Sequence, residues 1–79
     1  MTKPRMSLDE LGDLIVREVH RYKDCGGFKS ISIYPTDAIP GTNWMAGETA
    51  NYGTAGMVLC DAALREIIPR LQRLYDLRE

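Results

Sequence analysis

Ten residues in the middle of the chain, 35–44, hold two of its four prolines and its only tryptophan. Pro35 follows an alternating run and has no backbone N–H to donate, so we expect it to end a strand. Pro40 and Gly41 stand where a type II turn needs its central residues, because Pro presets the first φ and Gly allows a positive second φ. The segment therefore predicts a reversal of the chain, and hence a β-hairpin with a longer loop than the minimum.

The two strands that flank this reversal differ in strength. In 28–34, two isoleucines alternate with polar side chains, which is typical of a strand with one buried face. The second strand, from about 44 to 49, is weaker because it contains Ala and Gly. Two registers remain open: in one, Trp44 shares the core face with the isoleucines, and in the other Met45 takes that place. We expect Trp44 to be mostly buried, since a small chain seldom leaves its largest apolar side chain exposed.

A helix start precedes the first strand. Ser7 and Glu10 have the Ser-x-x-Glu spacing of a capping box, in which each side chain accepts a hydrogen bond from the other residue's backbone N–H. Apolar residues then recur at helical spacing, and basic residues follow near the end, as the helix dipole favours. We predict a helix over about 7–24, stopped by a left-handed glycine at 26–27, and a short mobile arm over 1–6.

A second amphipathic helix is predicted after a glycine-rich approach over 50–56, with Thr54 as its cap. Pro69 falls inside the pattern, where it removes one backbone hydrogen bond and clashes with the carbonyl of Arg65. We expect a kink at Pro69, with two shorter helices as the alternative. The apolar stripe consists of Met57, Cys60, Leu64, Ile67, Leu71 and Leu74.

These elements predict one α+β domain over 1–79 in the order α-β-β-α. In this fold two helices pack on one face of an antiparallel β-hairpin, and the second helix is kinked at Pro69. A chain this short buries only about 60% of the surface that its unfolded form exposes, and an isolated hairpin is marginal in water. Two copies that join their sheets would relieve this weakness, so we expect a homodimer.

Charge and cysteine content narrow the class of protein. The net charge is −1, and 24–61 contains a single lysine among its acidic residues, which disfavours contact of this segment with a phosphate backbone. Two cysteines are too few for a secreted disulfide scaffold. The sequence shows neither the apolar core of a signal peptide nor a run of ~20 apolar residues. We therefore expect a cytoplasmic protein without a membrane segment.

No pattern for catalysis, metal binding or a cofactor stands out. His20, Asp24 and Cys25 are close in sequence, and a His–Cys pair can form a nucleophile. On a helix, however, Cys25 is turned about 100° from Asp24. No zinc-ligand spacing joins these residues to Cys60, and the glycines of 53–56 lack the lysine of a phosphate-binding loop. We predict no metal, no cofactor and no enzymatic activity, with a small Cys/His-dependent enzyme as an alternative.

Aromatic and polar residues around the hairpin form the candidate contact surface, because interface centres are rich in Tyr and Trp. We predict a non-enzymatic protein-interaction module, homodimeric, that presents 35–52 to a protein partner. The alternative is a nucleic-acid-binding regulator that uses arginines of the second helix, which the mixed charges there disfavour. The candidate patch comprises Tyr34, Asp37, Asn43, Trp44 and Tyr52, and the arginines of the alternative are Arg65, Arg70 and Arg73.

Overall fold

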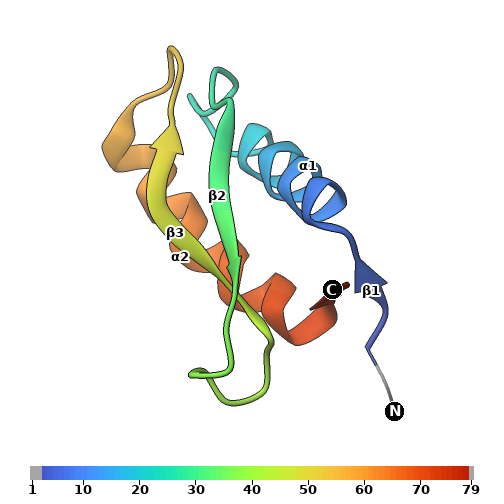
Figure 1. Cartoon of the computed structure of the whole chain (residues 1–79). Coiled ribbons are helices and arrows are strands. Elements are labelled where there is room, and N and C mark those ends of the chain that lie inside the picture. The colour runs from blue at the N-terminus through green and yellow to red at the C-terminus, as the bar shows by residue number, and fades with distance from the viewer. Residues whose placement is uncertain (1–2, 79) are drawn as a thin grey trace.

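The computed structural model of this chain describes residues 3–78. Two helices and an antiparallel two-stranded sheet confirm the predicted α+β class (Figure 1). A second, much shorter pair of strands joins the two ends of the described chain. The elements in chain order are β1 (Arg5–Met6), α1 (Leu8–His20), β2 (Ser30–Pro35), β3 (Trp44–Asn51), α2 (Met57–Leu74) and β4 (Asp76–Leu77).

The short strands β1 and β4 pair in parallel. Arg5 lies opposite Asp76, and Met6 lies opposite Leu77. Arg5 and Met6 of the predicted mobile arm over 1–6 are therefore paired with β4, while the first two residues lie outside the described part. The mobility of the arm stays a prediction. Periodicity could not predict this pairing, because each strand has only two residues and the strands come from opposite ends of the chain.

Helix α1 begins as predicted and ends earlier. The Ser7 Oγ accepts from the Glu10 N–H at 3.1 Å, and the Glu10 Oε1 accepts from the Ser7 N–H at 3.0 Å, which confirms the capping box. The helix ends at His20 rather than near residue 24. The left-handed residue that follows is Asp24, at φ 64°, and not a glycine at 26–27. Asp adopts this conformation more readily than most residues with a Cβ. The predicted end was therefore too late, because it assumed that a glycine would take the left-handed position.

The hairpin register places the tryptophan in the core. Pro35 lies opposite Trp44, and Tyr34 lies opposite Met45. Trp44 is 0% exposed, whereas Tyr34 and Met45 are exposed. The predicted burial of Trp44 is thus confirmed, and the register that would bury Met45 is not adopted. In the connecting loop Gly41 has a φ of 84°, as the second central residue of a type II turn requires.

The β2–β3 ladder contains an irregularity that lengthens β3. Ile31 pairs with Ala50, but Ile33 pairs with Ala46, so β3 passes more residues than β2 over the same interval. As a result, β3 continues to Asn51, beyond its predicted end.

Helix α2 is a single helix that contains Pro69. The alternative of two shorter helices is therefore not adopted, while a kink at Pro69 stays a prediction. Gly56 is the N-cap and supplies no side-chain hydrogen bond, so the prediction of Thr54 as the cap is wrong. Thr54 lies instead against Gly27, where an added Cβ would come within 2.0 Å of its Oγ1. The two loops at this end of the hairpin are therefore in close contact.

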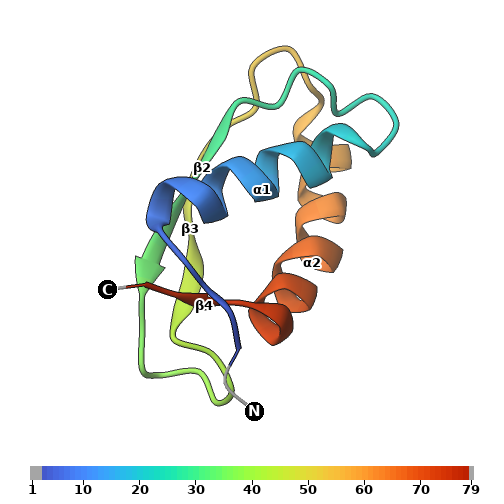
Figure 2. The same ribbon diagram turned by 90° about the vertical axis from the view of Figure 1, so that its right-hand side faces the viewer.

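The core is shared by the hairpin, both helices and the last strand. Figure 2 shows α2 on one side of β2 and β3, and α1 running beside β2. The packing of both helices on one face of the hairpin stays a prediction. The buried residues are Leu11, Ile15, Val19, Cys25, Phe28, Ile33, Trp44, Cys60, Ala63, Leu64, Ile67, Leu71 and Leu77.

Candidate functional site

Trp44 belongs to the core and not to a contact surface. Its indole Nε1–H donates to the backbone carbonyl of Tyr75 at 2.9 Å, and its own carbonyl accepts from the Gln72 side chain at 2.8 Å. Both partners lie at the C-terminal end of α2, so Trp44 ties the hairpin to that end. A fully buried indole offers nothing to a partner, which removes Trp44 from the predicted patch.

Asn43 also has a structural role. Its Nδ2 donates to the carbonyl of Leu77 at 2.9 Å, and its Oδ1 accepts from the Leu77 N–H at 2.7 Å. The side-chain amide therefore pairs with the backbone of β4 as a neighbouring strand would. Asp37 is exposed in the hairpin loop and borders a shallow hollow with Asn43.

The two tyrosines of the predicted patch lie at opposite ends of the hairpin. Tyr34 lies over Gly47, where an added Cβ would be 2.1 Å from its ring. Tyr52 packs edge-on against Phe28, and its hydroxyl donates to the Asp61 carboxylate. This hydrogen bond, together with burial and the negative charge of Asp61, raises the pKa of Tyr52 to about 12, because each favours the protonated hydroxyl. The structure thus does not gather the five predicted residues on one surface.

The three arginines of the nucleic-acid alternative have different surroundings. Arg70 forms an ion pair with Glu18 of α1, with 3.7 Å between its Nη2 and the Glu18 Oε1. Arg65 borders a groove between α2 and β3, and Arg73 borders a hollow beside the hairpin turn. This arrangement adds no support to the nucleic-acid alternative.

Of the residues considered for catalysis or zinc binding, His20 has a backbone contact, and Cys25 and Cys60 are buried. The His20 Nε2 lies 2.7 Å from the carbonyl oxygen of Phe28, and since a carbonyl only accepts, this nitrogen carries the proton. Cys25 and Cys60 are free and buried. Burial raises the pKa of the Cys60 thiol to about 11, which keeps it protonated at neutral pH. Within residues 3–78, no group of three His, Cys, Asp or Glu side chains could hold a metal ion.

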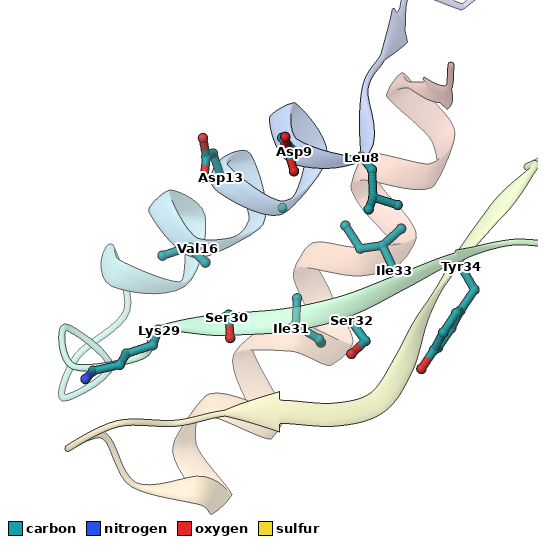
Figure 3. Close-up of a pocket in the computed structure, with 11 residues that line it drawn as sticks. Leu8, Asp9, Asp13, Val16, Lys29, Ser30, Ile31, Ser32, Ile33 and Tyr34 are labelled. Atoms are coloured by element: carbon teal, nitrogen blue, oxygen red, sulfur yellow. The ribbon is translucent and has the colours of Figure 1, made fainter. Parts of the chain in front are cut away.

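A groove between α1 and β2, the α1/β2 groove, is a candidate site that the sequence patterns did not indicate (Figure 3). One wall is a face of α1, and the other is the chain just before and along β2. The space measures about 360 Å³, which is within the range of protein binding sites. The lining residues are Leu8, Asp9, Gly12, Asp13 and Val16 of α1, and residues 29–34.

The walls of the α1/β2 groove combine apolar and acidic side chains. Leu8 and Ile33 point toward one another across it, and Val16 points toward β2 farther along the helix (Figure 3). Asp9 and Asp13 stand on the part of α1 that is farther from the strand. The groove therefore has an apolar floor and an acidic rim on the helix side.

The edge of β2 along this groove has no strand partner. In the described part of the chain, β2 is hydrogen-bonded to β3 alone, and no residue of β3 lines the groove. Alternate residues of an edge strand direct their N–H and C=O groups away from the paired neighbour. Because residues 29–34 along this edge line the α1/β2 groove, we expect these groups to face it, where water or another strand can satisfy them.

Gly12 keeps the middle of the groove open. It lies inside α1, where Gly costs about 1 kcal/mol relative to Ala. A Cβ at this position would meet no atom within 4 Å, so crowding inside the chain does not explain the glycine. A glycine also lets another backbone approach closely. The glycine between Asp9 and Asp13 is visible in the sequence, but its position alone does not indicate a groove.

Comparison of the chain with protein-family models, with curated proteins and with solved structures finds no match. In residues 3–78, neither helix combines the length and the apolar composition needed to cross a membrane. The site therefore has to be interpreted from its own geometry.

Proposed function

We propose that this protein is an interaction module that binds an extended segment of another protein in the α1/β2 groove. The segment adds to the free edge of β2 as a further strand. The observation that carries this proposal is that consecutive residues, 29–34, line the groove along an edge without a strand partner. Main-chain hydrogen bonds supply the affinity in this mode of recognition, and side-chain pockets supply the specificity.

The apolar floor and the size of the hairpin both support strand addition. Alternate side chains of an added strand would point toward Leu8, Val16 and Ile33, which border the groove. A two-stranded sheet is marginal in water, and a third strand would bury the edge groups that it leaves open. The bound segment would thus stabilise the fold as well as fill the groove.

This proposal keeps the predicted class, a non-enzymatic protein-interaction module, and moves the contact surface from 35–52 to the α1/β2 groove. The proposal also includes the predicted packing of both helices on one face of the hairpin, because that packing leaves the β2 edge open. The predicted bend of α2 at Pro69 is kept as part of the same fold. A homodimer would use the same edge if β2 of a second copy were the added strand. Self-association and binding of another protein are therefore competing occupants of one groove.

A selection from an unbiased library of displayed peptides of about ten residues, the length of a long strand, tests the proposal. Selected peptides should protect backbone amides of residues 30–34 from hydrogen exchange. The variant Gly12→Met places a side chain in the open middle of the groove and should weaken binding at least about tenfold. Gly26→Met is the matched control, since Gly26 is exposed, outside the groove lining and equally free of neighbours within 4 Å.

Two results would overturn the proposal. One is a library that yields no binder to the folded protein. The other is a set of binders that tolerate Gly12→Met as well as Gly26→Met, since their site would then lie elsewhere.

A further inference from the structure

We infer that the occupant of the α1/β2 groove is a basic segment, with Lys or Arg at two positions that are two residues apart. This inference rests on the proposed function and adds the chemistry of the partner. It is carried by the two aspartates of the rim, Asp9 and Asp13, which both line the groove from the same face of α1. Their spacing of four residues places them one helical turn apart.

Neither rim carboxylate forms an ion pair within residues 3–78. The ion pairs among residues 3–78 join Lys3 to Asp76, Glu18 to Arg21 and Arg70, and Glu10 to Arg78. Asp9 stands in the first turn of α1, where the helix dipole favours an acid. Asp13 lies beyond that turn, so the dipole does not account for it. The face toward the groove thus holds charge that a basic partner would neutralise.

The spacing of the rim matches the repeat of a strand. Residues four apart on a helix have Cβ atoms about 5–6 Å apart. Side chains two residues apart on a strand point the same way and lie about 6.6–6.8 Å apart. Two basic side chains on one face of an added strand can therefore reach both carboxylates at once.

The depth of the groove also suits Lys and Arg. Leu8 and Val16 lie nearer to β2 than the two aspartates do (Figure 3). A long basic side chain can lay its methylene stem along the apolar part and direct its charged head to the rim. Gly12, between Asp9 and Asp13, leaves open space for that stem.

The groove is also polarised along its length. Lys29 lines it at the start of β2, whereas Leu8 and Asp9 begin the opposite wall, near Ile33. A basic side chain beside Lys29 would be repelled, so the two basic positions should fall toward the Ile33 end. This condition fixes where the charge lies along the bound segment.

The composition of the selected peptides tests the inference directly. We expect enrichment of Lys and Arg at two positions two residues apart, with apolar residues next to them. In the best binder, replacing both basic residues with Gln should weaken binding to the wild-type protein at least about tenfold. A higher salt concentration should weaken binding of the basic peptide, because salt screens exposed charges. The affinity of the Gln peptide should stay nearly unchanged.

Variants of the rim supply the matched comparison. In the double variant Asp9→Asn, Asp13→Asn, the basic and Gln peptides should bind with the same affinity. Asp37→Asn lies in the exposed hairpin loop outside the groove. This variant should keep the full difference in affinity between the basic peptide and the Gln peptide. The Gln peptide should bind the double variant as it binds wild type, which shows that the double variant is folded.

The inference and the proposed function can fail separately. Groove binders without a basic preference, or a basic preference that survives in the double variant, would overturn the inference and leave strand addition standing. No groove binders at all would overturn both. Light scattering that shows a dimer dissociated by Gly12→Met but not by Gly26→Met would identify a second copy as the occupant, and would also overturn the inference.

Discussion

At the scale of single residues, close contacts between distant loops account for glycines that a sequence pattern treats only as flexible. Gly53 has a φ of 57°, and a Cβ there would lie 2.2 Å from the carbonyl oxygen of Gly27. Gly27 in turn faces Thr54. The absence of side chains at both glycines therefore lets the loop before β2 pack against the loop before α2.

The variant Gly53→Ala tests this contact. We expect it to lower the free energy of unfolding by about 2 kcal/mol or more, because a left-handed residue with a Cβ is strained and the Cβ also meets backbone. Gly26→Ala is the matched control, since no atom lies within 4 Å of its added Cβ. Urea denaturation followed by circular dichroism measures both variants, and equal stabilities would contradict the contact.

Trp44 shows why a large residue next to a turn need not be a surface anchor. Its burial and its hydrogen bond to Tyr75 make it the link between the hairpin and the end of α2. The fluorescence of this single tryptophan should therefore be blue-shifted and protected from iodide. A red-shifted, quenchable emission would contradict its place in the core.

The variant Trp44→Phe should lower the free energy of unfolding by about 2–4 kcal/mol. It leaves the Tyr75 carbonyl without its donor and opens a cavity in the core. Circular dichroism in urea is the suitable measurement, because the variant has no tryptophan fluorescence. Tyr34→Phe, at an exposed position of the same hairpin, is the control and should change stability little.

At the scale of elements, the capping box makes the start of α1 sensitive to pH. The Ser7 backbone N–H donates to the Glu10 carboxylate and, with the Ser7 side chain and nearby Arg78, lowers the Glu10 pKa below its usual 4.5. A carboxyl whose pKa is lowered by folding stabilises the protein above its unfolded pKa. That contribution is lost as the pH falls through the folded pKa.

In the variant Glu10→Gln, the free energy of unfolding should therefore depend less on pH in the acid range than it does in wild type. We expect wild type to lose its advantage over the variant as the pH falls below about 4.5. Urea midpoints measured across this range for both proteins give the comparison. A constant difference between the two curves would show that Glu10 does not carry this pH dependence.

The ends of the elements also differ in how accurately neighbouring residues predicted them. The cap of α1 and the turn at Gly41 follow from the conformational needs of neighbouring residues, so the sequence predicts them well. The end of α1 and the start of α2 were misplaced, because Asp24 took the left-handed position and Thr54 turned toward Gly27. A packing contact thus outweighed a local capping preference.

At the scale of the whole molecule, the arrangement leaves the edge of β2 that borders α1 without a strand partner in the described chain. Helix α1 runs beside β2, and the terminal strands pair with each other instead of extending the sheet. The edge of β2 therefore borders a groove rather than another strand. The proposed function and the basic character of its partner both depend on that arrangement.

The sequence indicated candidate contact residues on the hairpin, but not the α1/β2 groove. The residues chosen from the hairpin were selected for their chemical type, and Trp44 and Asn43 proved to hold the hairpin against the C-terminal part of the chain. Gly12 and the aspartates on either side of it are visible in the sequence. That these residues line a groove becomes clear only from the tertiary structure, which places the unpaired edge of β2 beside α1.

The sequence by itself determined the α+β class, the capped start of α1, the reversal at Gly41 and the burial of the central part of the apolar stripe on α2. The two ends of that predicted stripe, Met57 and Leu74, are exposed. These features depend on residues a few positions apart, whose periodicity and backbone preferences act locally. The tertiary structure alone decided the register that buries Trp44, the pairing of β1 with β4 and the α1/β2 groove. Each of these requires segments distant in the chain to meet, and the free energy of their packing is not encoded in any one segment.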